Sequence, residues 1–413
     1  MSRIRRGLGV VGAAALLLAT GLASPPAATA AGSPVGAAAP DVQAADAGWA
    51  VPSDGVVRLR GHGYGHGHGM SQYGARGAAQ KGLTHQQILA FYYPGTTLGT
   101  TSGNIWVHLT ADTDGTLQVL PATGLRVRQV GSGSSYVLPT SVGSATPTSW
   151  RLRTVSGRIV LEYLAGSSWR AHAPKDVTLS GAAAFYRPGG TVTLRVGSSD
   201  RTYRGSLRYV AGATVNVLRL DDYVRGVVPR EMPVSWEGAA VRTQAVAART
   251  YAAWERADHL GRSWHTCDTT SCQVYGGVGS EHPLGDAAVK ATAGQVLRWK
   301  GEPAFTQFSS SSGGWTRAGS MPYLVAKADP YDANASNPMN TWSTTLKRTT
   351  VQSAYPSIGT LQSLRVTRRD GNGDWGGRAT AVLLRGSKGE VTVSGSTFRS
   401  RFGLRSDWIR FGS

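Results

Sequence analysis

Three histidines and a tyrosine alternate with glycines over residues 61–69, in the stretch GHGYGHGHGMSQ, and both metal and phosphate binding must be considered. A GxGxxG phosphate loop fails on spacing, because its last position falls on His66 or His68. In an extended chain the imidazoles share one face, and His62 and His66 lie about 13 Å apart, too far for one ion. Only His66 and His68 could chelate together. The pattern favours a strand whose glycines another backbone approaches closely, with His66 and His68 facing a cleft; structural hydrogen bonding is the alternative.

Glu231 is the candidate for acid–base chemistry, in a chain with only seven glutamates. It precedes Met232-Pro233 and lies near Trp236 in the sequence. An apolar environment raises the pKa of a carboxyl group because it disfavours the charged form, and a general acid that works near neutral pH needs such a shift. A structural or surface role in a loop before a helix is the alternative.

The helix expected after Glu231 runs from about Trp236 to His259, with Ser235 as its N-cap and Gly261 as its stop. One stripe of this helix consists of small residues, an amide and a tyrosine: Ala240, Gln244, Ala248 and Tyr251. A buried amide without a partner costs about 1–3 kcal/mol, so the glutamine needs a hydrogen bond. Tight packing of this helix against a sheet is expected whatever the function.

The N-terminus has the layout of a secretory signal peptide, with three arginines, an apolar run over residues 8–22 and a small-x-small site at residues 28–30. The run is short for a membrane span of about 20 residues, although an uncleaved anchor is the alternative. We therefore expect an exported protein associated with the cell wall. In that compartment Cys267 and Cys272, the only cysteines, favour a disulfide over zinc, because C-x4-C is not a standard zinc spacing.

The chain of 413 residues carries a formal net charge of +19, which suits a polyanionic partner such as a cell wall, unless it reflects only a compositional bias toward arginine. No basic helix or aromatic RNA-binding pattern supports nucleic acid as a partner. Thr84 and Gln87 match a capping box that starts a short helix. Short alternating strands follow over residues 104–218 and 360–412. Because strands and helices are separated along the chain, the predicted class is α+β, β-rich with one strong central helix and several short helices.

Several long motifs together resemble the SpoIID/LytB family of cell-wall proteins. They are LRLDDYVRGVVPREMP, AVRTQAVAARTYAAW, CDTTSCQVYGG, FSSSSGGWT, MPYL and VSGSTFRSRFGLRS, in this order, and the resemblance covers nearly all of residues 55–413. The stretch MSQYGARGAAQKGLTHQQILAFYYPGTTL resembles another segment of the family. Family members usually carry this Gly-His-Gly-Met-Ser-Gln segment near the C-terminus, after FR…GLRS. Here it stands at the front, so the order resembles a circularly permuted SpoIID-like domain.

A permuted order makes a structural prediction, because the termini of a domain often lie close together. We expect Val56–Arg60 to pair with, or lie beside, Trp408–Phe411. The predicted organisation is a signal peptide (1–30), a flexible leader (31–54), the Gly-His segment with short helices (55–98), a β-rich region (104–204) and a SpoIID/LytB-like catalytic core (205–413).

The resemblance implies two functions. SpoIID members resemble lytic transglycosylases that cut peptidoglycan glycan strands lacking stem peptides, whereas LytB-type members are named as enhancers of wall amidases. Glu231 matches the family's catalytic glutamate in EMP. Some members hold zinc beside a histidine that precedes the second cysteine, but Ser271 occupies that place here. No metal or other cofactor is therefore expected.

The expected partners are glycan strands and, in the alternative reading, a wall amidase. A third reading, a secreted metal-binding protein built on the histidines, competes with both. Candidate substrate-binding residues come from the motifs above: Gln244, Arg249, Tyr251, Gln273, Tyr275, Ser311, Ser312, His66, His68 and Gln72.

Overall fold

A computed structural model describes residues 46–412; the expected signal peptide and residues 31–45 of the expected leader lie outside the described residues. The described part is mixed α+β and rich in strands, as predicted. Its α-helices are α1 (Gln72–Gln80), α2 (His85–Tyr92), α3 (Leu220–Glu231), α4 (Gly238–Asp258), α5 (Pro283–Ala291), α6 (Arg348–Ala354) and α7 (Gly395–Arg401). None of the helices within residues 46–412 is long and apolar enough to cross a membrane.

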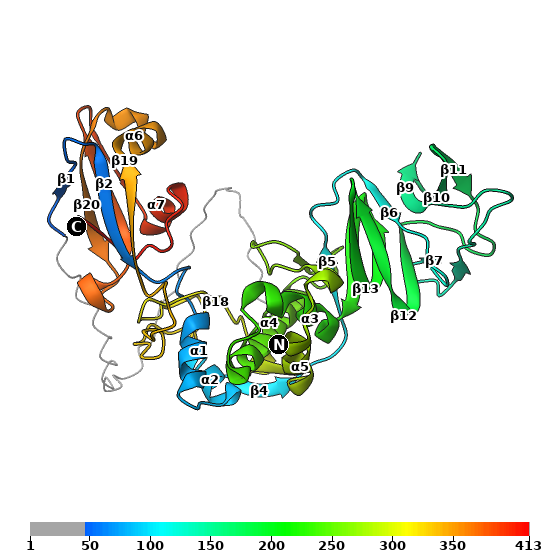
Figure 1. Ribbon diagram of the computed structural model, residues 1–413, viewed down its shortest axis with the longest axis horizontal. Helices are drawn as coiled ribbons and strands as arrows, with labels where there is room; N and C mark the ends of the chain where they lie inside the picture. Colours follow the sequence, from blue (N-terminus) through cyan, green and yellow to red (C-terminus); the bar gives the residue numbers. More distant parts are fainter. Residues whose placement is uncertain (1–45, 413) are drawn as a thin grey trace, which may run out of the picture. The chain divides into compact units, whose positions relative to one another are not determined.

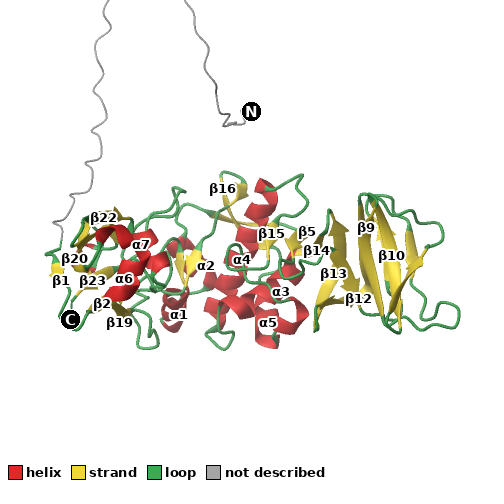
Figure 2. Cartoon of the chain, turned by 90° about the horizontal axis from the view of Figure 1, so that it is seen from above, coloured by secondary structure: helices red, strands yellow, loops and turns green. Residues whose placement is uncertain are grey.

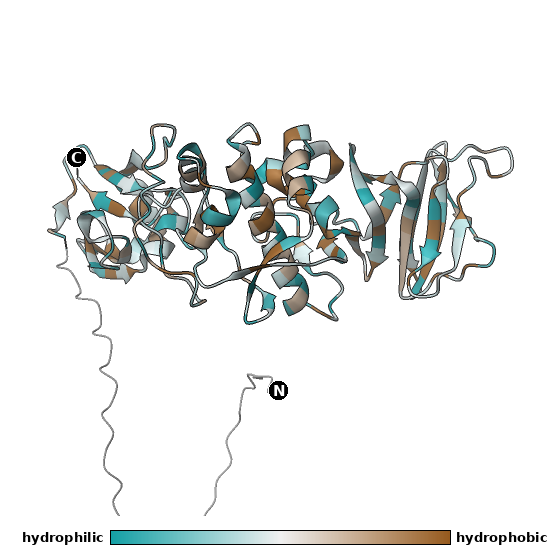
Figure 3. Cartoon of the chain, turned by 90° about the horizontal axis from the view of Figure 1, so that it is seen from below, coloured by the Kyte–Doolittle hydropathy of each residue, from teal (hydrophilic) through white to brown (hydrophobic). Residues whose placement is uncertain are grey.

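The largest sheet has eleven strands and contains most of the strands expected over residues 104–218 (Figure 1). They are β5 (Asn104–His108), β6 (Thr116–Val119), β7 (Arg126–Gln129), β8 (Ser135–Val137), β9 (Ser149–Val155), β10 (Arg158–Ala165), β11 (Ser168–His172), β12 (Ala182–Val196), β13 (Ser199–Val210), β14 (Ala213–Arg219) and β15 (Thr266–Cys267). Buried and solvent-facing positions alternate along strands such as β5 and β6, the period-2 pattern of a half-buried sheet. Figure 3 shows the corresponding bands of hydropathy along the strands.

Two further sheets hold the end of the chain. One has the order β1 (Trp49–Ala50), β20 (Leu361–Arg369), β21 (Ala379–Gly386) and β22 (Glu390–Val393). The other has β2 (Val56–His62) between β19 (Thr341–Lys347) and β23 (Ile409–Phe411), as Figure 2 shows. Leu59 lies opposite Phe411 and Gly61 opposite Ile409, so the predicted pairing of the first segment with the last is confirmed. The permuted order itself stays a prediction.

Part of the expected leader is ordered. The described residues 46–54 include β1, which pairs with β20, and the Asp46 carboxylate accepts a hydrogen bond of 3.0 Å from Arg369 Nε. The composition of this segment predicted flexibility, but backbone pairing and an ion pair hold it against the sheet. The packed part of the chain therefore begins before the predicted boundary at residue 55.

Short strands and helices surround α4. The strands form two small sheets, one of β4 (Thr97–Thr100), β16 (Gln295–Trp299) and β17 (Glu302–Pro303), the other of β3 (Met70–Ser71) and β18 (Phe308–Ser309). The capping box of Thr84 and Gln87 is present at the start of α2, as predicted. Helix α4 is buried along most of its length, because its alanines let neighbouring backbones approach on several sides.

Two details of the helices differ from expectation. The N-cap of α4 is Glu237 rather than Ser235, so the helix starts two residues later than predicted. The sequence predicts a loop at Glu231, whereas this residue is the last of α3, a helix that contains Pro229. The proline lies close to the C-terminal end of α3 and does not prevent the helix from reaching Glu231.

Candidate active site

A cleft of about 490 Å³ lies where segments distant in the sequence meet beside Glu231. The Gly-His stretch forms one wall, the loop around Gln273 forms another, and the serine-rich loop after residue 306 forms a third. The lining residues are Tyr64, Gly65, His66, Glu231, Tyr251, Thr270, Ser271, Cys272, Gln273, Val274, Gln307, Phe308, Ser309 and Ser310. The structure thus brings Glu231, His66, Tyr251 and Gln273 of the predicted site together.

Glu231 is held at both its side chain and its backbone. Its Oε1 accepts a hydrogen bond of 3.1 Å from the backbone N–H of Val274, and its carbonyl accepts one of 2.8 Å from Gln72 Nε2. Burial raises the pKa of the Glu231 carboxyl group, and the Val274 hydrogen bond opposes that rise only in part. Within residues 46–412, no hydrogen bond to protein engages Oε2, so this oxygen remains available to a ligand in the cleft.

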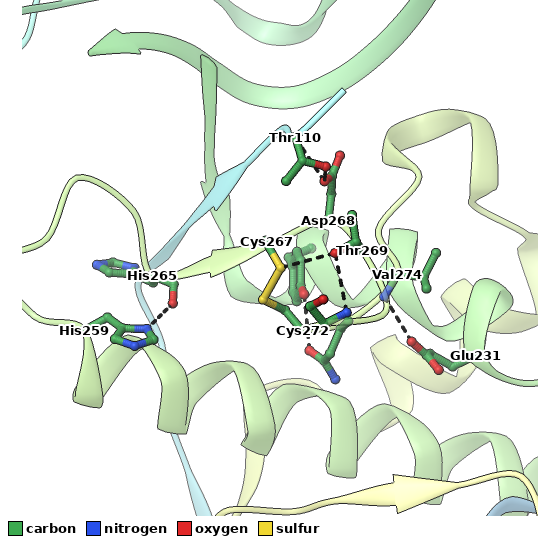
Figure 4. Close-up of a disulfide and its surroundings, with 12 residues drawn as sticks. Thr110, Glu231, His259, His265, Cys267, Asp268, Thr269, Cys272 and Val274 are labelled. Atoms are coloured by element: carbon green, nitrogen blue, oxygen red, sulfur yellow. Dashed lines mark hydrogen bonds between the residues drawn. A yellow bond between two sulfur atoms is a disulfide. The ribbon is translucent and has the colours of Figure 1, made fainter. Parts of the chain in front are cut away.

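A disulfide lies just before Val274, the residue whose N–H donates a hydrogen bond to Glu231 (Figure 4). Cys267 and Cys272 are joined, the pairing that the sequence favours over zinc, with Cα atoms 5.5 Å apart. Asp268 fixes the same loop by accepting hydrogen bonds from the backbone and side chain of Thr110. Because Gln273 and Val274 follow the disulfide directly, it limits the motion of the wall that contacts the acid.

The nearby histidines do not complete a metal site. His259 Nδ1 donates to the carbonyl of His265, and His265 Nδ1 accepts from the backbone N–H of Trp106. No group of three or more typical ligand side chains occurs in the part of the chain that the structure describes.

The Gly-His stretch is not the extended strand that its alternation predicts beyond His62. Gly63, Gly65, Gly67 and Gly69 all have positive φ, between 68° and 119°, so the chain turns repeatedly instead of presenting one flat face. The predicted close approach of another backbone is confirmed. A Cβ atom at Gly69 would lie 2.1 Å from the carbonyl oxygen of Gln307, and one at Gly63 would lie 2.8 Å from that of Ser311.

His66 and His68 have different environments. His66 lines the cleft, and its Nδ1 accepts a hydrogen bond of 3.0 Å from the backbone N–H of His68. Burial lowers the pKa of His66 to about 3, so the ring is neutral near pH 7 and carries its proton on Nε2. His68 stacks on His66 with ring centroids 5.2 Å apart, but it lines an adjoining cavity instead. His62 is buried against Trp375 and Trp408.

Three glutamines support the cleft. Gln72 Nε2 bridges the Glu231 carbonyl and, at 3.2 Å, Gln244 Oε1, whereas Nε2 of the fully buried Gln244 has no hydrogen-bond partner within residues 46–412. Gln273 reaches the cleft, and its Oε1 accepts a hydrogen bond from the hydroxyl of Tyr223. Gln72 and Gln244 therefore position Glu231 from behind, whereas Gln273 is almost fully buried at the edge of the cleft, with its Nε2 unpartnered within residues 46–412.

Besides Gln72 and Gln244, four further predicted substrate-binding residues lie in the protein interior and not in the cleft. Arg249 is fully buried, and its guanidinium donates to Asp221 at 2.6 Å and to backbone carbonyls. The hydroxyl of Tyr275 donates to Asn216, while its ring packs against Tyr223. The remaining two, Ser311 and Ser312, donate to the buried carboxylates of Asp332 and Asp329. The motif pattern cannot distinguish these roles, because polar side chains that organise a site and those that face it occur in the same segments.

Tyr64, Thr270, Gln307, Ser309 and Ser310 also line the cleft, although the sequence motifs do not single them out. The SSSSGG motif does indicate serines at the site, but the first two, Ser309 and Ser310, line the cleft, whereas the prediction names the last two, Ser311 and Ser312. Tyr64 alternates with glycines in the same way as the three histidines, so the pattern carries a signal for it as well. Tyr251 lines the cleft, and its role in substrate binding stays a prediction. Burial raises its pKa to about 12, so it remains a neutral hydrogen-bonding group.

Comparison with known proteins matches the segment that holds Glu231 to a family. Residues 210–299, which include Glu231, Gln244 and Gln273, match the SpoIID family model, described as stage II sporulation protein. The chain therefore contains a SpoIID-family domain, as its motifs predict.

The similar proteins agree with this assignment. An amidase enhancer of Bacillus subtilis (strain 168) is 39% identical over 131 residues, which cover 30% of this chain and 17% of that protein. A stage II sporulation protein D of the same organism is 26% identical over 226 residues, which cover 49% of this chain and 64% of that protein. An uncharacterised protein of Brachyspira hyodysenteriae is 36% identical over 129 residues, or 30% of this chain and 35% of its own length. In each case the match spans less than two thirds of the relative.

Proposed function

We propose that the protein is an exported peptidoglycan lytic transglycosylase that uses Glu231 as its single acid and base. The observation that carries the proposal is the setting of Glu231: a carboxyl group with a pKa raised by burial, with one oxygen held by Val274 and the other available in a cleft of about 490 Å³. A raised pKa increases the fraction of the acid that is protonated, and proton donation requires the protonated form.

The reaction needs two proton transfers, one from the Glu231 carboxyl group and one back to it. Protonated Glu231 gives its proton to the glycosidic oxygen while the bond from that oxygen to C1 of the muramic acid residue breaks. The resulting carboxylate then takes the proton of the C6 hydroxyl, and O6 bonds to C1 to close a 1,6-anhydro ring. No water is consumed, and Glu231 is protonated again at the end.

The absence of a second acid in the cleft supports this mechanism over hydrolysis, which in most glycosidases requires two carboxylates. Glu231 is the only carboxylate among the cleft-lining residues within 46–412. Glu237, the nearest candidate in sequence, is engaged by Arg76 Nε at 3.2 Å and by Gln80 Nε2 at 2.9 Å. It stabilises the contact between α1 and the start of α4.

A non-catalytic role is the second candidate, favoured by the 39% identity to a protein named as an amidase enhancer. In that case the same cleft binds glycan strands, and a separate wall amidase performs the cleavage. Both functions need the cleft, but only the enzyme needs the carboxyl group of Glu231 to exchange protons.

The two functions separate when the purified protein is incubated with peptide-stripped glycan strands and the products are analysed by mass spectrometry. The transglycosylase should release products with 1,6-anhydro ends, and Glu231→Gln should abolish them. Glu302→Gln, which changes an exposed glutamate, serves as the matched control and should leave product formation intact. Absence of such products, together with faster release by an added amidase, would instead establish the enhancer.

A further inference from the structure

A second cavity, of about 540 Å³, adjoins the Glu231 cleft, because His66 and Gln307 line both. We call it the Arg399 pocket. Its lining residues are His66, His68, Phe305, Gln307, Arg317, Ala318, Gly319, Ser320, Ser396, Arg399 and Asp407. A chain-like ligand in the Glu231 cleft can therefore continue past His66 into this pocket.

The arginines of this region outnumber the acids. Asp407 is almost fully buried and accepts from Arg317 Nη1 at 2.7 Å and from Arg378 Nη1 at 3.0 Å. A second acid of this region, the half-buried Asp370, accepts from backbone N–H groups, including that of Arg378. The carboxylate of Asp407 is thus already shared by two guanidinium groups before Arg399 is considered.

Arg399 forms no ion pair within the described residues 46–412, although Asp407 acts on it at a distance. Its guanidinium is half-buried, and this desolvation lowers its pKa. His66 and His68 add no negative charge, and their own pKa values are lowered, so both are neutral near pH 7. Partial burial of a cation without a bonded anion is costly, and a bound anion would offset that cost.

We infer that the Arg399 pocket binds a carboxylate on the muramic acid residues of a glycan strand whose reacting bond lies beside Glu231. This inference rests on the proposed function for the identity of the strand. Muramic acid is the sugar of peptidoglycan that carries a carboxylate, on its lactyl ether. That carboxylate is free in stripped strands, whereas in intact strands the attached peptide supplies carboxylates instead. A planar guanidinium matches either source by paired hydrogen bonds.

The test measures binding rather than cleavage. Full-length protein with Glu231→Gln, which prevents turnover, is titrated calorimetrically with soluble stripped strands, with the same strands after amidation of their lactyl carboxylates, and with peptide-bearing strands. Each titration is repeated after adding Arg399→Gln, Arg399→Lys or Arg401→Gln. Arg401 lies on the same helix, is exposed and does not line the pocket, so it controls for loss of one charge.

Arg399→Gln is expected to weaken binding of stripped strands by about tenfold or more, the effect of losing a charge-assisted hydrogen bond. Amidated strands should bind weakly and be insensitive to Arg399→Gln. Arg399→Lys keeps the charge but loses the paired hydrogen bonds, so it should retain only part of the affinity, whereas Arg401→Gln should retain all of it. If peptide-bearing strands alone show the Arg399 dependence, the carboxylate comes from the peptide.

Equal weakening for carboxylate and amidated strands, or no binding of any strand, would overturn the inference. Arg399-dependent binding without cleavage by the unmodified protein would leave the pocket in place and refute the transglycosylase. The two failures are therefore distinguishable.

Discussion

Replacing Asp332 by asparagine is expected to destabilise the protein and loosen the serine-rich wall of the cleft. Asp332 is fully buried, and both of its carboxylate oxygens accept several hydrogen bonds. Oδ1 accepts from the hydroxyl of Ser71 and the N–H of Ser312, and Oδ2 from the hydroxyl of Ser311, the N–H of Gly313, and the side-chain amides of Asn337 and Asn340. This carboxylate joins the serine-rich loop to the start of α1.

The magnitude follows from the donors that asparagine cannot serve. An amide nitrogen at the Oδ2 position would face four donors, so the less damaging orientation places it at Oδ1, against Ser71 and Ser312. Each buried donor left without an acceptor costs about 1–3 kcal/mol, which gives a loss of about 2–6 kcal/mol. Against a total stability of about 5–15 kcal/mol for a typical domain, this loss is large.

The assay is urea unfolding followed by tryptophan fluorescence, with Asp258→Asn as the matched control. Asp258 has 57% of its side-chain surface exposed, so its replacement should change the free energy of unfolding by less than about 0.5 kcal/mol. If the free energy of unfolding of Asp332→Asn is as close to that of the unmodified protein as the value for the control is, the buried carboxylate does not organise the wall, and the reasoning is refuted.

Three other substitutions test separate parts of the structure by the same unfolding assay. Gly65→Ala places a Cβ atom 2.4 Å from that of Ser309, so it should lower the free energy of unfolding clearly more than Gly115→Ala. A Cβ atom at Gly115 meets nothing within 4 Å, so that substitution costs only the positive-φ strain of about 1–2 kcal/mol. Equal losses would argue against close packing of the cleft wall. Burial raises the pKa of Asp329 to about 7 from 3.8, so ionisation of this carboxyl group opposes folding. As the pH rises from 3.8 to 7, Asp329→Asn should therefore gain stability relative to the unmodified protein. A stability difference between the two proteins that does not change with pH would contradict this. Arg153 and Arg151 hold the pKa of Glu162 down at about 2, so the stability that its ionised form contributes is present above pH 4.5 and lost as the pH falls through 2. Glu162→Gln should be less stable than the unmodified protein near pH 5, and the difference in stability should close on acidification. Equal stability of the two proteins near pH 5 would show that the ion pairs contribute nothing.

The sequence predicted those features whose signals are local. A capping box at Thr84, the long helix α4 and the cysteine pairing each depend on a few neighbouring residues and were found in the structure. The pairing of β2 with β23 is a long-range feature, and it could be predicted only because the order of the family's motifs implied that the two ends meet.

What the sequence could not supply was the direction in which polar side chains face. Arg249 sits in the same helix as Tyr251, yet it turns inward to Asp221 while the tyrosine lines the cleft. Positive φ at four glycines likewise breaks the alternation between His62 and Met70, because residues with a side chain would be strained there and glycine is not. Both outcomes are decided by tertiary packing, which periodicity alone does not describe.

The position of the Gly-His stretch in the chain matters less for the site than its position in space. Residues 210–299 contain the acid but only one of the three walls around it. The wall formed by the Gly-His stretch reaches Glu231 through Gln72, which donates a hydrogen bond to the Glu231 carbonyl. The adjacent Ser71 donates a hydrogen bond to Asp332, which in turn holds the wall formed by the serine-rich loop. Pairing of β2 with β19 and β23 fixes where this stretch begins, and that pairing is the same whether the stretch comes first or last in the sequence. A permuted order is therefore compatible with an unchanged cleft, because the burial that raises the pKa of Glu231 depends on which segments meet and not on the order in which the chain connects them.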